Sequence, residues 1–248
     1  MDKNNNKVAL VTGSTGGIGT AICKALHNAG YTVVAHYRNR EKAEEWNTKL
    51  KNDGYDLPLA MADVSNFDEV EKMFEDIEKR IGTVDILVNN AGITRDGSFR
   101  KMSFEQWNSV INADLTSVFN CCRHAINPML EGKFGRIVNV SSVNGQRGQF
   151  GQVNYSAAKA GMHGFTKSLA METARKGVTI NTVSPGYVAT DMVMAVPEDI
   201  RNQIIAEIPM GRLGTPEEIA DIIAYIVSDK AGFVTGANFA INGGQHVY

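Results

Sequence analysis

Short β-branched runs alternate with longer amphipathic stretches along most of the chain. Apolar runs of this length indicate strands buried on both faces, and a 3.6-residue period indicates helices. The expected strands are residues 7–12, 32–37, 84–89, 136–141 and 178–183, with weaker ones at 57–61 and 238–241. The expected helices are residues 17–29, 41–52, 66–81, 104–130, 155–176 and 216–228.

This alternation predicts one doubly wound α/β domain over residues 1–248, because no repeat or linker interrupts it. We expect a seven-stranded parallel sheet with helices on both faces. Residues 1–6 are predicted to be a flexible tail. Residues 190–214 break the rhythm with a methionine- and proline-containing segment around a short helix pattern, and we interpret them as a substrate lid.

Charge and cysteine usage exclude several classes of protein. Lysine and arginine number 25 and aspartate and glutamate 27, for a net charge of −2, which argues against nucleic-acid binding. Cys23, Cys121 and Cys122 form neither a disulfide framework nor a CxxC zinc pair, so we expect reduced thiols and no metal. Neither a signal peptide nor a membrane-spanning run is recognisable, so we expect a cytoplasmic protein.

The first expected strand runs directly into a glycine-rich turn, Thr12-Gly13-Ser14-Thr15-Gly16-Gly17-Ile18-Gly19, at the start of a helix. A helix N-terminus offers unpaired N–H groups, and glycines let a phosphate approach the backbone. The lysine of a P-loop is missing. The turn therefore predicts a dinucleotide site, and the alternative is a tight turn that uses its glycines for packing alone.

The second expected strand ends in Arg38-Asn39-Arg40, without a carboxylate before Glu41. An acidic residue here would accept the ribose 2′-hydroxyl of NAD, whereas a basic residue accommodates the 2′-phosphate of NADP. Arg38 and Arg40 therefore favour NADP(H) as the cofactor, because guanidinium groups pair well with phosphate. The alternative is that both arginines are simply solvated.

Ser142, Tyr155 and Lys159 form the candidate catalytic group. Ser142 follows an expected strand, and Tyr155 and Lys159 share one helix face because they are four residues apart. A neighbouring ammonium favours the phenolate form of a tyrosine. These groups suit carbonyl reduction, in which Tyr155 gives a proton to the substrate oxygen and Ser142 stabilises its developing charge.

Together these residues closely resemble the short-chain dehydrogenase/reductase family, over essentially the whole chain. The matching segments are residues 12–19, Asp63-Val64, Asn89-Asn90-Ala91-Gly92, Ser142, Tyr155-xxx-Lys159 and Pro185-Gly186. The resemblance implies a Rossmann-type fold and a homotetramer. Beside Arg38 and Arg40 it implies cofactor contacts from Gly13, Ser14, Gly17, Ile18, Gly19, Asp63, Val64, Asn90, Ala91, Gly92, Tyr155, Lys159, Pro185, Gly186, Val188 and Thr190.

One position departs from the family pattern. The family has an asparagine in its long fourth helix that holds a water in the proton relay to the lysine, and Asp114 occupies the matching position here. An aspartate still accepts hydrogen bonds, and its charge favours protonated Lys159. It could also bend the helix differently. We hypothesise that the enzyme is active with Asp114 in the relay position.

Residues 92–102 and 141–155 look most like the acetoacetyl-CoA reductases of polyhydroxybutyrate synthesis. This likeness implies NADPH-dependent reduction of acetoacetyl-CoA to an (R)-3-hydroxyacyl thioester. The implied substrate-binding residues are Asp96, Lys101, Gln149, Phe150, Gln152 and Tyr187. The alternatives are a 3-oxoacyl-acyl-carrier-protein reductase, which would have acyl carrier protein as its partner, and a non-catalytic dinucleotide-binding scaffold.

Overall fold

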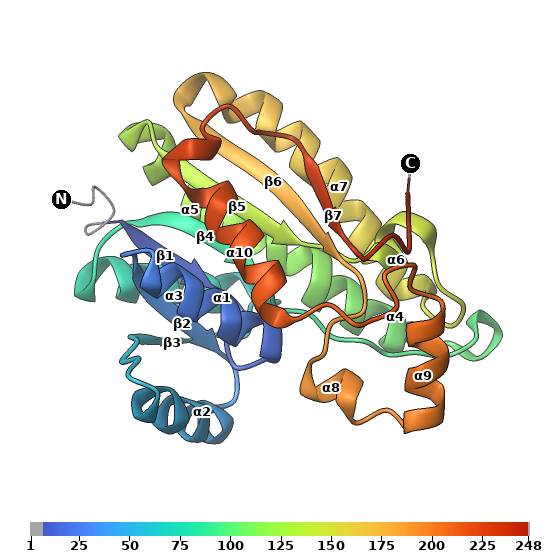
Figure 1. Cartoon of the computed structure of the whole chain (residues 1–248). Coiled ribbons are helices and arrows are strands. Elements are labelled where there is room, and N and C mark those ends of the chain that lie inside the picture. The colour runs from blue at the N-terminus through green and yellow to red at the C-terminus, as the bar shows by residue number, and fades with distance from the viewer. Residues whose placement is uncertain (1–6, 248) are drawn as a thin grey trace.

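A single parallel sheet of seven strands organises the chain, in the order β3-β2-β1-β4-β5-β6-β7. The computed structural model describes residues 7–247, and Figure 1 shows the sheet between its helices. The strands are β1 (Val8–Val11), β2 (Thr32–Tyr37), β3 (Leu59–Met61), β4 (Val84–Asn89), β5 (Gly135–Val140), β6 (Val178–Pro185) and β7 (Asn238–Ile241). The order reverses between β1 and β4, which is where doubly wound sheets bind ligands at their carboxyl ends.

The longer helices confirm the predicted doubly wound arrangement. They are α1 (Gly17–Asn28), α2 (Arg40–Asn52), α3 (Phe67–Arg80), α4 (Phe104–Ile111), α5 (Ser117–Gly132), α7 (Val153–Thr173), α9 (Glu198–Ala206) and α10 (Pro216–Val227). Two short helices, α6 (Val143–Arg147) and α8 (Asp191–Met194), follow β5 and β6. Short 3-10 turns lie at Phe99–Lys101, Ala174–Lys176 and Asp229–Ala231.

The sheet buries a separate apolar core on each face. Successive side chains of a strand point to opposite faces, so Ala9 and Val11 of β1 enter one core while Val8 and Leu10 enter the other. Helices α1 and α10 cover the first core, with fully buried Ile22 and Ile223 among the contacts. Helices α3, α5 and α7 cover the second core. This double coverage explains why the strand sequences are almost continuously apolar.

Local start signals account for several helix boundaries. Thr215 caps α10 in a capping box with Glu218, and Pro216 occupies the first turn, as the sequence pattern indicates. Ser103 forms the equivalent capping box with Gln106 at the start of α4. These side chains satisfy N–H groups that a helix cannot pair internally.

The predicted helix over residues 104–130 is continuous, but it is not α-helical throughout. Helices α4 and α5 are separated by a π-helical turn, η2 (Asn112–Thr116), which contains Asp114. A π turn widens the helix locally, and such turns occur often at functional sites. The expected strand at residues 57–61 is also shorter, since β3 begins at Leu59, and helix α6 was not predicted.

The predicted lid segment, residues 190–214, contains α8 and α9, which extend from the sheet below its carboxyl ends in Figure 1. The predicted tail, residues 1–6, lies outside the described residues. Over residues 7–247, the helices are too short or too polar to cross a bilayer.

Candidate active site

Ser142 links the end of β5 to helix α6. It is the N-cap residue of α6, and its Oγ accepts a hydrogen bond of 3.1 Å from the Asn144 N–H. A hydroxyl that accepts this bond keeps its own hydrogen to donate. The cap therefore fixes the Ser142 oxygen while leaving its O–H available for a substrate oxygen.

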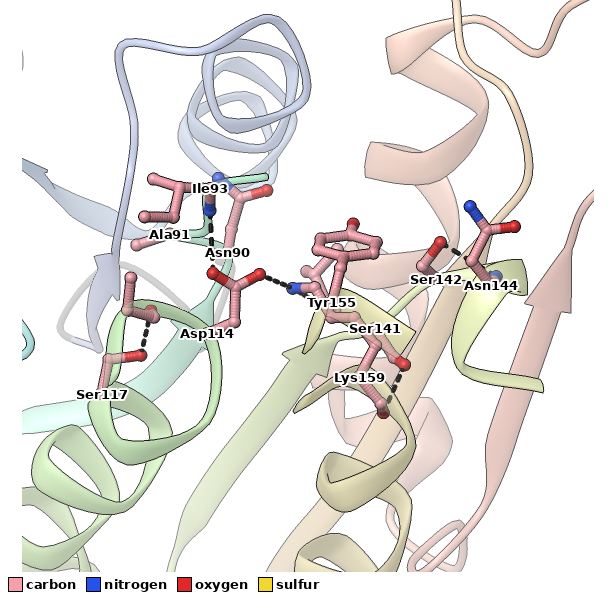
Figure 2. Close-up of polar contacts among 12 residues, drawn as sticks. Asn90, Ala91, Ile93, Asp114, Ser117, Ser141, Ser142, Asn144, Tyr155 and Lys159 are labelled. Carbon is pink, nitrogen blue, oxygen red and sulfur yellow. Dashed lines mark hydrogen bonds and ion pairs between the residues drawn. The ribbon is translucent and has the colours of Figure 1, made fainter. Parts of the chain in front are cut away.

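Tyr155 and Lys159 lie one turn apart at the start of α7, as their spacing predicts. The Lys159 Nζ is 5.4 Å from the centre of the Tyr155 ring. Figure 2 shows the ring between the Lys159 side chain and Ser142 in this view. Lys159 is only 3% exposed, and its ammonium donates a 2.9 Å hydrogen bond to the Val140 carbonyl. The charge that faces the phenol is therefore held by the protein rather than by water.

Asp114 meets Lys159 from the π turn. Its Oδ1 accepts a 2.8 Å hydrogen bond from the Ile93 N–H, and its Oδ2 lies 3.4 Å from the Lys159 Nζ. Figure 2 shows both contacts. Burial raises the pKa of Asp114, although Lys159 and the Ile93 N–H lower it in part. The position matched to the family asparagine thus carries a buried carboxylate paired directly with the lysine.

Ser141 and Gly145 hold the backbone of Lys159 in place. The Ser141 hydroxyl donates a 2.8 Å hydrogen bond to the Lys159 carbonyl, and it also lies 3.0 Å from the His163 Nε2. A Cβ on Gly145 would come within 2.8 Å of the Lys159 backbone, so glycine allows α6 to pack directly on α7. The sequence analysis did not include Gly145, Ser141 or His163 among the site residues.

The glycine turn fits a dinucleotide phosphate. No side chain caps α1, and its first turn contains no acidic residue. Gly16 and Gly17 are exposed, whereas the Ser14 hydroxyl is buried and donates to the Val11 carbonyl. The N–H groups of Gly13, Ser14 and Gly16 bond within the protein, so the N–H groups of the first turn of α1 are the donors that an anion would meet. Ser14 contributes no free hydroxyl.

Packing explains part of the glycine pattern. Gly13 adopts φ +64, and a Cβ there would lie 2.8 Å from the Ala91 Cα. A Cβ on Gly19 would collide with the Gly13 carbonyl oxygen. The packing alternative therefore applies to these two glycines, while Gly16 and Gly17 form the exposed surface of the turn.

Thr12 and Asn90 join the glycine turn to the segment after β4. The Thr12 Oγ1 accepts hydrogen bonds of 3.0 Å from the N–H groups of Asn90 and Ala91. The Asn90 side chain donates to the Thr12 and Gly13 carbonyls. A Cβ on Gly92 would lie 2.8 Å from the Asp114 Oδ2. The Asn90–Gly92 segment thus connects the cofactor turn to the buried ion pair.

Known proteins are similar in sequence to this chain over nearly its whole length. A family profile described as "Enoyl-(Acyl carrier protein) reductase" matches residues 13–246. A protein from Allochromatium vinosum named acetoacetyl-CoA reductase is 55% identical over 98% of this chain and 99% of its own length. The chain belongs to the short-chain dehydrogenase/reductase family. It is therefore an oxidoreductase of the CH–OH/C=O type with a nicotinamide dinucleotide cofactor.

Two further relatives span the alternatives within the family. The acetoacetyl-CoA reductase of Cupriavidus necator is 52% identical over 97% of this chain and 98% of its own length. A 3-oxoacyl-[acyl-carrier-protein] reductase of Staphylococcus aureus is 42% identical, also over 97% of this chain and 98% of its own length.

The residues predicted to bind the adenosine part of the cofactor follow β2 and β3. Arg38 is exposed, and its Nη1 lies 3.6 Å from the Asp63 Oδ2. Burial raises the pKa of Asp63, but hydrogen bonds from Ser65 and the charge of Arg38 lower it by more. The pKa of Asp63 is therefore below its usual value. Arg40 is exposed at the first position of α2, and Val64 is buried. The four residues thus lie beyond the carboxyl ends of β2 and β3.

Three of the predicted cofactor residues, Gly186, Val188 and Thr190, follow β6. A Cβ on Gly17 would lie 3.0 Å from the Thr190 Cγ2, so this segment meets the glycine turn. Val188 is buried and bridges to Gly214. A Cβ on Gly186, directly after Pro185, would collide with Asn242 and Gln245. Gly186 thus permits close packing of the C-terminal segment, and its contact with the cofactor stays a prediction.

The predicted substrate residues divide into bonded and exposed side chains. The Gln152 Nε2 donates a 2.9 Å hydrogen bond to Asp96, and its Oε1 accepts one of 2.9 Å from Asn144. Both ends of this amide are therefore used within the protein. Burial raises the pKa of Tyr187, which is half-buried. The exposed members of the set are Asp96, Lys101, Gln149 and Phe150.

Proposed function

We propose that this reductase transfers a hydride from NADPH to acetoacetyl-CoA and forms the (R)-3-hydroxyacyl thioester. The observation that carries this proposal is the buried Lys159, which is fixed beside Tyr155 by Val140 and Asp114. Such an arrangement serves a carbonyl oxygen that must receive a proton. Relatives named acetoacetyl-CoA reductase, 55% and 52% identical, support the choice of substrate.

The chain's own residues account for the proton side of the reaction. A bound reduced nicotinamide would supply the hydride. Ser142 would donate a hydrogen bond to the substrate carbonyl oxygen, because Asn144 already occupies one of its lone pairs. Tyr155 would give its proton to that oxygen. The Lys159 ammonium would stabilise the phenolate left behind, and Asp114 would hold that ammonium in place through their 3.4 Å ion pair.

Arg38 and Arg40 support NADP(H) over NAD(H). Both are exposed at the carboxyl end of β2 and the start of α2, where the 2′-phosphate of an NADP would lie. Asp63, two residues after β3, is 3.6 Å from Arg38 and more than a third exposed, so a phosphate can compete for this guanidinium. The other predicted cofactor-facing residues would line the same cleft.

The substrate would enter between the Asp96–Lys101 segment and the loop after α6. The Asp96–Gln152–Asn144 hydrogen bonds would hold that loop, and Phe150, which is 89% exposed, would cover the acyl and pantetheine parts. In this proposal residues 190–214 act as the substrate lid, and the enzyme is a cytoplasmic homotetramer.

A 3-oxoacyl-acyl-carrier-protein reductase is the second candidate, favoured by the Staphylococcus aureus relative at 42% identity. Such an enzyme needs a basic surface for its acidic carrier protein. Lys133 and Lys176 are both exposed and would be the first residues to test in that surface.

The deciding experiment measures NADPH oxidation with acetoacetyl-CoA and with the same acyl group on acyl carrier protein. We expect a higher kcat/KM for the CoA thioester, and Tyr155→Phe to lower kcat by about 1,000-fold because the proton donor is lost. A strong preference for the carrier-protein thioester would establish the second candidate instead. Full activity of Tyr155→Phe would refute the proposed mechanism.

A further inference from the structure

His36 occupies a buried position between two segments of the cofactor site. It lies in β2, two residues before Arg38, and is 2% exposed. Its Nδ1 is 3.0 Å from the Gly13 backbone nitrogen, and its Nε2 is 3.0 Å from the Ala62 carbonyl oxygen. One ring therefore contacts both the glycine turn and the residue that precedes Asp63.

The two partners fix the tautomer of the ring. The Gly13 N–H can only donate, so Nδ1 accepts, and the Ala62 carbonyl can only accept, so Nε2 carries the hydrogen. Burial lowers the pKa of His36 to about 4, with the nearby charges of Asp63 and Arg38 acting in opposite directions. The ring is consequently neutral at pH 7, and both of its nitrogens are occupied.

The Gly13 peptide groups are held from two strands. His36 accepts from the N–H, and the Asn90 side chain, which follows β4, donates a 3.1 Å hydrogen bond to the carbonyl. The His36 carbonyl in turn accepts from the Ser14 N–H at 3.1 Å. Gly13 has φ +64, which is one of many backbone conformations open to a glycine. These contacts therefore select the conformation that Gly13 adopts in the folded protein.

We propose that His36 is a positioning residue for the dinucleotide, acting through the Gly13 N–H rather than by touching the cofactor. It holds the turn in the shape that receives the pyrophosphate, so that binding does not have to order the turn. Through Ala62 it also fixes the spacing between this turn and the adenosine side. The inference rests on the proposed cofactor site and extends it to a residue outside the cleft.

Two conservative variants separate the contacts of the ring. In His36→Asn the side-chain oxygen lies near the Nδ1 position and can still accept from Gly13. In His36→Gln the amide nitrogen lies near the Nε2 position and can still donate to Ala62, but the Gly13 N–H loses its acceptor. His36→Phe keeps the ring volume and removes both hydrogen bonds.

The test measures the Kd for NADPH and for NADH by fluorescence titration, together with kcat at saturating cofactor and the Tm of each variant. We expect Kd to rise about tenfold in His36→Gln and His36→Phe and less than about threefold in His36→Asn, since a buried donor is left unpaired only in the first two. NADPH and NADH should be affected equally, because both contain the pyrophosphate. The kcat should stay within about twofold in all three.

The Kd values of the wild type for NADPH and NADH are measured first. Failure of the wild type to bind NADPH or NADH would refute the proposed cofactor site and with it this role. Normal wild-type binding, with a lower Tm but unchanged Kd in His36→Gln, would overturn the positioning role alone. Equal increases in Kd for His36→Asn and His36→Gln would also overturn it, because the Gly13 contact would then not be what matters. If His36→Phe fails to fold, the Asn and Gln variants decide.

Discussion

Two carboxylate–cation pairs lie among the predicted cofactor-binding and catalytic residues, at similar distances and in opposite surroundings. Asp114 and Lys159 are 3.4 Å apart with side chains 0% and 4% exposed. Asp63 and Arg38 are 3.6 Å apart with side chains 36% and 65% exposed. The comparison separates what distance contributes from what burial contributes, because the chemistry and the spacing are nearly the same.

Burial changes both the strength of a pair and what it can do. Charges attract more strongly where water is excluded, but an unpaired buried charge is costly, so Asp114 and Lys159 are bound to each other. An exposed pair is screened and contributes little to stability. Arg38 can therefore exchange its partner for a ligand phosphate, whereas Lys159 keeps its position throughout a reaction.

The largest effect is expected from breaking the buried pair. Asp114→Ala removes the counter-charge of Lys159 and the acceptor of the Ile93 N–H. We expect kcat to fall about 100-fold, as for the loss of a proton-transfer component. The free energy of unfolding should fall by about 3–5 kcal/mol, because Lys159 would be left as an unpaired buried charge. Steady-state kinetics and denaturant unfolding measure the two effects.

Asp114→Asn is the matched control for this prediction. Its side-chain oxygen can still accept from the Ile93 N–H, while the negative charge is lost. We expect its kcat to lie between those of wild type and Asp114→Ala. If both variants had wild-type kinetics, Asp114 would have no part in the proton relay.

The next effect comes from the exposed pair, and it should appear in cofactor choice rather than in kcat. Arg38→Ala removes a guanidinium that we propose binds the 2′-phosphate. We expect the KM for NADPH to rise about tenfold or more, the size of a charge-assisted hydrogen bond. The KM for NADH should stay unchanged, because NADH has no 2′-phosphate. An equal rise for both cofactors would contradict the assignment.

The sequence was sufficient to predict the sheet and to place Tyr155 and Lys159 on one helix face. Continuous β-branched runs predicted the strands because both faces of the sheet are covered, and the Tyr155-to-Lys159 spacing fixed their shared helix face. These features depend on local periodicity, which a single sequence displays.

Features set by distant contacts could not be predicted. Asp114 in the π turn contacts Ile93 and Lys159, and neither lies nearby in the chain. Similarly, Gln152 was predicted to bind the substrate, and no local pattern indicated that Asp96, 56 positions earlier, accepts from its amide. Nothing in the pattern around His36 indicates its contact with Gly13.

The smallest effect expected is on stability at the exposed pair. Asp63→Asn keeps an oxygen that can accept from Ser65 and removes the charge facing Arg38. We expect the free energy of unfolding at pH 7 to fall by less than about 1 kcal/mol, because solvent screens this pair.

The pH dependence shows the direction of the small contribution that Asp63 makes to the free energy of unfolding. The pKa of Asp63 is lowered in the folded protein, so its contribution to stability is present above the unfolded value of about 4 and is lost as pH falls below it. Wild type and Asp63→Asn should therefore differ slightly at pH 7 and converge in acid. Denaturant unfolding of both proteins over this range measures the difference. A gap as large as that for Asp114→Ala would show that exposure does not separate the two pairs.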